Sequence, residues 1–294
     1  MHDASDLARL CAHPVFATEH YASGAGEKLK RSIALGPAYY FSGVPRYLSE
    51  RRRKGIRGGD AEILWNPLHE FGLLGTAIRS LPPGLEGVLD DLAREGMRIT
   101  LKPKRFLAIC AEWWHATARG PSSVVECGSY EGVTGIALAL LARRSGRDQQ
   151  IHMFDVFGSL EPLKFRPVDG ERQSNEFELS SDIPDRLRSV AGRLGIEACI
   201  TLHVGLFGKT FPAFRDDPAR PLRFAHIDAN LYESTREAVG FVLPRLAEGA
   251  IVVFDDYHAI TDLGARLAID EMLGEEARAL VRLSGTSAVL RRPG

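Results

Sequence analysis

From about Ser122 onward, short runs of β-forming residues alternate strictly with helical patterns. This alternation indicates βαβ units, which form a parallel sheet with helices on both faces. Residues 251–254 are all apolar, which is typical of a central strand covered on both sides. The final runs, "ARALVRLSG" and "TSAVLRRPG", predict two strands joined by a Gly-containing turn. The predicted fold class is therefore α/β, a doubly wound and mostly parallel sheet with an antiparallel C-terminal strand pair.

The first hundred residues lack this alternation. Residues 82–96 and 102–120 look helical, and the second of these segments has an apolar face at three- and four-residue spacing, made of Phe106, Ile109, Cys110, Trp113 and Trp114. We therefore divide the chain into a mainly helical region at residues 1–97 and an α/β domain at residues 98–294. We expect the first region to cover the ligand face as a lid or to form a subunit contact, and we expect a homo-oligomer.

Composition excludes several classes of protein. The chain has 294 residues, of which 45% are hydrophobic, and a net charge of −1, which gives no reason to expect a nucleic-acid partner. The basic run at residues 51–54 is short, and we interpret it as a solvated helix end. No targeting signal and no apolar run of about 18 residues is visible, so we expect a cytoplasmic protein without a membrane partner. The cysteines lack paired spacing, which argues against a disulfide scaffold or a zinc site: Cys11, Cys110, Cys127 and Cys199.

The turn after the first predicted strand, "VVECGSYEGVTG", indicates a ligand site. In an open α/β sheet, ligands bind beyond the carboxyl ends of the strands. Gly128, Gly132 and Gly135 allow close approach of the backbone, and the helix that follows offers free N–H groups. Asp155 ends the second predicted strand, where an acid can accept hydrogen bonds from ribose hydroxyls.

The spacing of this turn separates two kinds of nucleoside cofactor. Nicotinamide cofactors require G-x-G-x-x-G to bring a pyrophosphate onto the helix, whereas this turn has G-x-x-x-G and is preceded by Glu126. A carboxylate there repels a pyrophosphate and suits an ammonium or sulfonium group. S-adenosylmethionine carries both groups and is the predicted cofactor.

Three carboxylates follow the fourth and fifth predicted strands, namely Asp228, Asp255 and Asp256. The ends of adjacent parallel strands lie close together, and mutual repulsion in a half-buried cleft would raise the pKa of these acids. A hard divalent cation removes that repulsion, so we predict a Mg²⁺ site. The alternative is that some of them cap helices or pair with arginine, and the candidate partners are Arg223, Arg236 and Arg266.

Together these stretches resemble the macrocin and mycinamicin sugar O-methyltransferases, which are class I S-adenosylmethionine enzymes. The matching segments, between residues 98 and 294, are "VVECGSYEG", "FDVFGSL", "HVGLFGKTFP", "HIDANLYEST", "LPRLAEGAIVVFDDY" and "AIDEML". The resemblance implies a magnesium-dependent O-methyltransferase that acts on a sugar or a related natural product. It implies that Asp155 binds the ribose, that Gly205 and Phe207 lie near the adenine, and that the first turn holds the rest of the cofactor through Glu126, Gly128, Ser129, Tyr130, Gly132 and Thr134.

The chain departs from this family at two places. Asn230 stands where a second Asp is common, and residues 258–260 replace a Gly and a Trp-Pro stretch. The catechol O-methyltransferases, which share the first turn, have a catalytic Lys where this chain has Leu231. We therefore consider His258 as the catalytic base, with Asp228 as the competing candidate, and we expect His226 to give structural support.

Two other functions remain open. One is methyl transfer to an amine or a phenol without a metal, and the other is cofactor binding without catalysis. A nicotinamide dehydrogenase is disfavoured by the spacing of the first turn.

Overall fold

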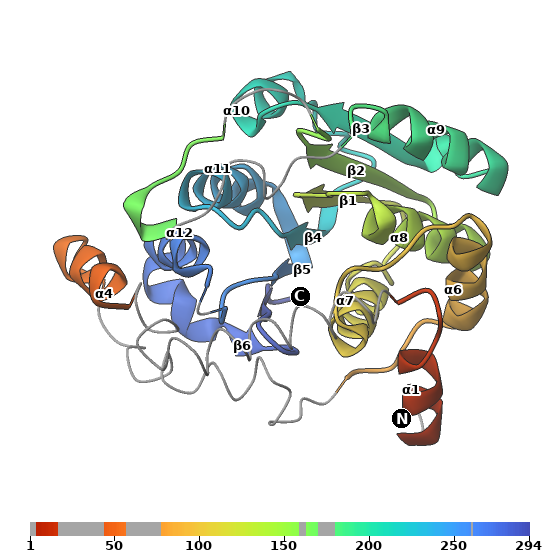
Figure 1. The fold of residues 1–294 in the computed structure, drawn as a ribbon, viewed down its shortest axis with the longest axis horizontal. Helices are drawn as coiled ribbons and strands as arrows, with labels where there is room; N and C mark the ends of the chain where they lie inside the picture. Colours follow the sequence, from red (N-terminus) through yellow and green to blue (C-terminus); the bar gives the residue numbers. More distant parts are fainter. Residues whose placement is uncertain (1–3, 17–43, 57–77, 159–162, 170–179, 260) are drawn as a thin grey trace.

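The structure is a computed structural model of the chain, and it describes residues 4–16, 44–56, 78–158, 163–169, 180–259 and 261–294. Its centre is a sheet of seven strands in the order β3-β2-β1-β4-β5-β7-β6 (Figure 1). The strands are β1 Ser122–Cys127, β2 Gln149–Asp155, β3 Ile200–Val204, β4 Leu222–Ile227, β5 Leu246–Phe254, β6 Val281–Arg282 and β7 Ala288–Arg291. Strands β1 to β5 pair in parallel, and β7 runs antiparallel to both β5 and β6. The predicted fold class is confirmed.

The register of the central strands places their ends at one edge of the sheet. Cys127 on β1 pairs with Ile227 on β4, and Ile227 pairs with Phe254 on β5. The residues that follow these positions are Gly128, Asp228 and Asp255. The segments that carry the predicted site therefore meet at the carboxyl edge.

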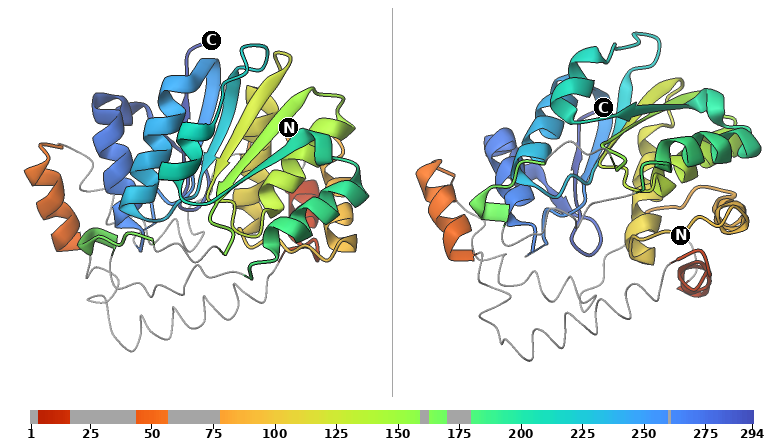
Figure 2. Two further views of the ribbon diagram at one scale, coloured as in Figure 1. Left: turned by 90° about the horizontal axis from the view of Figure 1, so that it is seen from above. Right: turned by 45° about the horizontal axis from the view of Figure 1, so that its top comes forward.

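Helices cover both faces of the sheet (Figure 2). One face carries α7 Pro103–Ala116, α8 Val133–Arg144 and α9 Ile183–Leu194, and the other carries α10 Phe207–Thr210, α11 Tyr232–Val242 and α12 Leu263–Leu273. Two apolar cores result, because alternate strand residues face opposite sides. Val124 and Phe224 pack with α7 and α8, whereas Val125 and Phe254 pack with α11 and α12. Short 3₁₀ segments connect the elements: Pro167–Asp169, Glu197–Cys199, Phe211–Ala213, Leu243–Arg245 and Gly274–Ala279.

Helix α7 is more deeply buried than its sequence pattern predicts. Its predicted apolar face is buried apart from Trp114, which is half-buried, and the intervening residues 107, 108, 111 and 112 are buried as well. The helix packs against β4 and β5 on one side and is covered by other N-terminal segments on the other. It begins with Pro103, which suits the first helical position because its missing N–H needs no partner there.

The described parts of the N-terminal region are also helical. They include α1 Ala4–Cys11, α4 Val44–Arg53 and α6 Leu85–Arg94. Helix α6 packs on α8 and shares its core, and α4 packs on α12 (Figure 1). The division at residue 97 stays a prediction, because residues 17–43 and 57–77 lie outside the described parts of the chain, as does residue 260. Among the described residues, no helix has both the length and the apolar character that a membrane crossing requires.

The interpretation of residues 51–54 as a solvated helix end needs one correction. Arg52 and Arg53 are exposed, but Arg51 is buried, with 4% of its surface accessible. Its guanidinium donates to the carboxylate of Asp270 on α12 over 2.6 Å. A charge run on a helix can place one member inward because every third or fourth residue shares a face.

Candidate active site

A pocket opens where β1 and β4 end. The turn after β1 lines it with Glu126, Gly128, Ser129, Tyr130 and Thr134, and β4 contributes His226 and Asp228. All the first-turn residues predicted to bind the cofactor therefore face this pocket, except Gly132, which is the N-cap of α8. The remaining part of the lining was not predicted: it is formed by residues 99–101, just before α7, together with Glu131 and Val133.

Two glycines shape the first turn. Gly128 has φ 86°, and a Cβ built there would lie 1.9 Å from the backbone carbonyl oxygen of Asp228. Gly132 has φ 75°, and its Cβ would lie 2.6 Å from the side chain of Leu187 on α9. Side chains are excluded at both places, so the turn can lie close to β4 and to whatever the pocket holds.

One carboxylate oxygen of Glu126 accepts no hydrogen bond from the described residues. Its Oε1 accepts a hydrogen bond from His226 Nδ1 over 3.1 Å, whereas its Oε2 and the hydroxyl oxygen of Ser129 have no hydrogen-bond partner among the described residues. Both side chains are buried and line the pocket. Buried polar atoms without a partner are costly, so a ligand that donates hydrogen bonds would be favoured here. The ammonium group of S-adenosylmethionine fits that requirement.

His226 lies between two carboxylates at the base of the pocket. Its Nε2 is 3.8 Å from Asp255 Oδ1, on the side opposite Glu126. Burial lowers the pKa of His226, but the hydrogen bonds and negative charges of Asp255 and Glu126 outweigh that effect and raise it to about 10. His226 thus bridges the two carboxylates. Its structural role stays a prediction.

Asp155 holds the first turn in place. Its Oδ2 accepts a hydrogen bond from the backbone N–H of Tyr130, and its Oδ1 accepts one from the N–H of Phe157, both at 2.8 Å. Burial raises the pKa of Asp155, and these two hydrogen bonds counteract that effect. Its contact with a ribose stays a prediction, as do the adenine contacts of Gly205 and Phe207, which do not line the pocket. Gly205 donates its N–H to the backbone oxygen of Asp155, and Phe207 stacks on Phe211.

The predicted carboxylates do converge at the ends of β4 and β5. Among the described residues, His226, Asp228 and Asp255 each offer one possible ligand atom, and these atoms lie within 4.8 Å of one another. Asp256 does not belong to this compact group. The carboxylate of Asp228 borders the pocket, and desolvation together with the charges of Asp255 and Asp256 raises its pKa well above the ordinary value.

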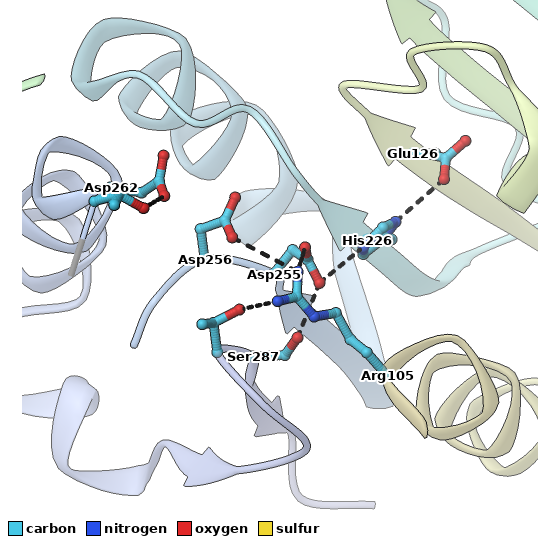
Figure 3. A network of polar contacts seen from close by, with 9 residues as sticks. Arg105, Glu126, His226, Asp255, Asp256, Asp262 and Ser287 are labelled. Atoms are coloured by element: carbon cyan, nitrogen blue, oxygen red, sulfur yellow. Dashed lines mark hydrogen bonds and ion pairs between the residues drawn. The ribbon is translucent and has the colours of Figure 1, made fainter. Parts of the chain in front are cut away.

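An arginine from α7 lies among these acids (Figure 3). Arg105 Nη1 donates to Asp255 Oδ2 over 2.5 Å and lies 3.7 Å from Asp256 Oδ1. Burial alone would raise the pKa of Asp255, but Arg105, His226 and a hydrogen bond from Ser287 lower it below its usual range. The alternative of arginine pairing is therefore correct for this pair, but with a different arginine from the three considered. Arg223 donates to the backbone oxygen of Glu248, and Arg266 lies over the ring of Tyr257.

His258 is buried two residues beyond the acid pair. Its backbone N–H donates to Thr286 over 2.7 Å, and its Nδ1 lies 2.9 Å from Arg282 Nη2, which donates to it. A lone pair that accepts from a guanidinium cannot take a proton while that contact lasts. His258 is not part of the pocket lining, and its role as a base stays a prediction.

Asn230, one of the departures from the family pattern, has φ 55° in the turn between β4 and α11. Asn tolerates this left-handed conformation better than most residues do, because its short side chain can hydrogen-bond locally.

Sequence reasoning missed Arg105 and the lining at residues 99–101. One signal for Arg105 was present. It lies in the first turn of α7, which has no acidic residue, although the positive end of a helix dipole disfavours a cation. Such a placement indicates a strong negative partner elsewhere in the fold.

Comparisons with known proteins agree with this description. Residues 125–257 match a family described as a methyltransferase domain. The chain is 26% identical over 166 residues to 8-demethyl-8-(2,3-dimethoxy-alpha-L-rhamnosyl)-tetracenomycin-C 4'-O-methyltransferase of Streptomyces olivaceus, covering 53% of this chain and 62% of that protein. It is 26% identical over 144 residues to mycinamicin III 3''-O-methyltransferase of Micromonospora griseorubida, covering 47% of this chain and 56% of that protein. The alignments thus span less than two thirds of these relatives.

A solved structure has the same fold. The calicheamicin methyltransferase CalS11 superposes with a TM-score of 0.56 and 20% identity, over 74% of this chain and 97% of that one. These relationships support S-adenosylmethionine as the cofactor. The resemblance predicted from the sequence is confirmed: residues 125–257 match a methyltransferase domain, and the chain is similar to sugar O-methyltransferases and shares its fold with a solved methyltransferase.

Proposed function

We propose that the protein transfers a methyl group from S-adenosylmethionine to a hydroxyl group of a small-molecule natural product, with a sugar as the favoured acceptor. The observation that carries this proposal is the pocket at the ends of β1 and β4. There the unpartnered oxygen of Glu126 and the carboxylate of Asp228 border the same space. Two relatives are named as O-methyltransferases of a rhamnosyl tetracenomycin and of mycinamicin III. These names support a glycosylated acceptor.

In this proposal the first turn binds the methionine end of the cofactor. Glu126 Oε2 and the hydroxyl oxygen of Ser129 accept hydrogen bonds from the ammonium group. The backbone at Gly128 and Gly132 leaves room for the cofactor, and Tyr130 and Thr134 flank it. Asp155 then holds the ribose, with Gly205 and Phe207 near the adenine.

The reaction needs little covalent chemistry from the protein. The acceptor oxygen forms a bond to the methyl carbon as the bond from that carbon to sulfur breaks, and S-adenosylhomocysteine leaves with both electrons of the broken bond. The hydroxyl proton goes to a base. We favour Asp228 for this role because it borders the pocket, with His258 as the second candidate. Most of the rate enhancement would come from alignment of the two reacting atoms.

The acid cluster fits a divalent cation. Asp228, Asp255 and Asp256 supply the oxygen ligands that Mg²⁺ prefers. Burial, together with the charges of Asp255 and Asp256, raises the pKa of Asp228, and a bound cation would offset both effects. We propose that these three residues hold Mg²⁺. A bound ion would lower the pKa of the acceptor hydroxyl.

Two experiments test the proposal. Thermal-shift titration with S-adenosylhomocysteine should stabilise the protein, whereas NAD should leave its melting temperature unchanged. Methyl transfer to glycosylated acceptors should then stop when EDTA is added and resume with Mg²⁺. Absence of any S-adenosylhomocysteine binding would contradict the methyltransferase proposal, and full activity under strict chelation would contradict the metal alone.

One observation favours a second candidate, methyl transfer without a metal to an amine or a phenol. Arg105 already places a positive charge against Asp255 and Asp256. The EDTA experiment separates the two candidates, because only the metal-free reaction survives chelation.

The region at residues 1–97 has its own place in the proposal. We propose that it acts as a lid over the acceptor or as a subunit contact in a homo-oligomer. Light scattering on the full chain, with and without S-adenosylhomocysteine, would test the second role.

A further inference from the structure

Arg105 has an unusual position for a cation. It projects from the first turn of α7 into the acid cluster, and only 12% of its side chain is exposed. Its two terminal nitrogens contact different elements. Nη1 contacts Asp255 and approaches Asp256 after β5, and Nη2 donates to the hydroxyl oxygen of Thr286 before β7. The guanidinium therefore bridges the acid pair and the turn between β6 and β7.

The contacts of Asp255 leave no carboxylate oxygen without a donor. Oδ2 accepts from Arg105, and Oδ1 accepts from the Ser287 hydroxyl over 2.9 Å, with His226 at 3.8 Å (Figure 3). A divalent ion that took Oδ2 would stand against the guanidinium, and two positive charges at that separation repel strongly in a buried site. The arginine and the ion therefore cannot both use this oxygen.

Resting on the function proposed above, we infer that Arg105 is an internal counter-cation that competes with the divalent ion for the acid pair. In the metal-free protein it neutralises Asp255 and part of the charge of Asp256. When the ion binds, the guanidinium moves off Asp255 and retains its contact with Thr286. Arg105 thus weakens metal binding and stabilises the metal-free protein.

The hydrogen bond to Thr286 makes this exchange feasible. It holds the guanidinium at the edge of the cluster through a neutral acceptor. The side chain then needs to give up only its contact with the acid pair. A lysine at this position would keep the positive charge but lose the hydrogen bond to Thr286, because an ammonium group lacks the two terminal nitrogens of a guanidinium.

The test compares Arg105→Gln, Arg105→Lys and the control Arg119→Gln, an exposed arginine just beyond the other end of α7. Metal-stripped full-length proteins are titrated with Mg²⁺ by calorimetry, and melting temperatures are measured in EDTA and in Mg²⁺. Titration with S-adenosylhomocysteine reports whether each variant is folded and whether the cofactor pocket is intact.

We expect Arg105→Gln to bind Mg²⁺ about tenfold more tightly than the natural protein, because one neighbouring positive charge is removed. Its melting temperature should fall in EDTA and recover in Mg²⁺ by more than that of the natural protein. Arg119→Gln should keep the natural Mg²⁺ affinity within about twofold, because this arginine is exposed. Arg105→Lys keeps the positive charge and should bind Mg²⁺ less tightly than Arg105→Gln does. Equal or weaker Mg²⁺ binding by Arg105→Gln would overturn the inference.

A structure of the natural protein with Mg²⁺ gives a second test that needs no variant. The inference requires that Arg105 has left Asp255, and it is overturned if metal and guanidinium share the carboxylate.

The same titrations distinguish failure of this inference from failure of the proposed function. If neither protein binds Mg²⁺ while both bind S-adenosylhomocysteine, the competition and the metal are wrong but the methyltransferase assignment stands. If Arg105→Gln binds Mg²⁺ more tightly than the natural protein and S-adenosylhomocysteine binds to neither, the competition stands and the methyltransferase proposal fails.

Discussion

Gly128 at the end of β1 lies directly against the backbone carbonyl of Asp228 at the end of β4. The place where a Cβ would be is 1.9 Å from that oxygen, and 2.7 Å from the carbonyl carbon. The two segments are also hydrogen-bonded, because the backbone N–H of Asp228 donates to the backbone oxygen of Cys127 over 2.8 Å. The cofactor turn and the proposed metal ligand are therefore joined through main-chain contacts.

This contact predicts a large effect of one methyl group. Gly128→Ala should destabilise the protein by at least about 3 kcal/mol, from the steric overlap and the left-handed backbone together. The control is Gly146→Ala, where φ is 66° but nothing lies within 4 Å of the added Cβ, and the cost should be only about 1 kcal/mol. Denaturant unfolding measures both. Equal losses would show that the overlap relaxes and that backbone conformation alone matters.

Loss of the charge on Glu126 should weaken cofactor binding specifically through the amino group. Glu126→Gln should lower the affinity for S-adenosylmethionine about 10- to 100-fold, as expected for a hydrogen bond to a charged group. An analogue without the amino group should bind to both proteins equally, as calorimetry can measure. Glu248→Gln, exposed at the far end of β5, is the control. A loss of the same size for both ligands would place Glu126 in a structural role only.

The pair between Arg51 on α4 and Asp270 on α12 should be important for stability. Both side chains are 4% exposed, and Asp270 also accepts hydrogen bonds from Tyr47 and Tyr257. Arg51→Met should lower the free energy of unfolding by about 3 kcal/mol, because it removes the nearer of two cations beside a buried carboxylate and leaves only Arg266, whose Nε is 3.9 Å from Asp270 Oδ2. Arg188→Met breaks an exposed pair with Asp185 and should cost less than about 1 kcal/mol. Similar midpoints in urea for the two variants would contradict this expectation.

His152 on β2 predicts an acid-sensitive stability. Burial and the neighbouring His203 lower its pKa from 6.5 to about 4, so the folded protein releases a proton that the unfolded chain still binds. Stability should therefore fall as the pH drops from 6.5 to 4, by roughly 3 kcal/mol from this residue. His152→Gln should flatten the pH dependence of the melting temperature across that interval. An unchanged slope would mean that other groups cause the acid sensitivity.

The sheet could be predicted because its signals are local. Apolar runs such as residues 251–254 and the turn glycines act through their immediate neighbours, and parallel pairing then brings the strand ends together. The positions of Glu126, Asp228 and Asp255 at one edge follow from that rule and from the register. The same reasoning gave the antiparallel strands β6 and β7.

The arginine partners of the buried carboxylates could not be predicted, because these contacts join residues that are far apart in the sequence. Arg105 and Asp255 are 150 residues apart, and Arg51 and Asp270 are 219 residues apart. Which arginine reaches a carboxylate depends on how α7 and α4 pack, and helix packing is fixed by side-chain shape along the whole interface. The group of possible ligand atoms that the described residues form includes His226 in place of Asp256, which the sequence did not predict either.

The hydrogen bond from Ser287 to Asp255 has a consequence for biosynthesis. Ser287 and β7 leave the ribosome after every element that lines the cofactor pocket, and β7 is the antiparallel neighbour of β5. Until β7 has been synthesised, one edge of β5 is unpaired and Asp255 lacks the hydrogen bond from Ser287. A nascent chain halted between residues 256 and 286 would hold the complete first turn but an unfinished acid cluster, so cofactor binding should mature before the proposed metal site does.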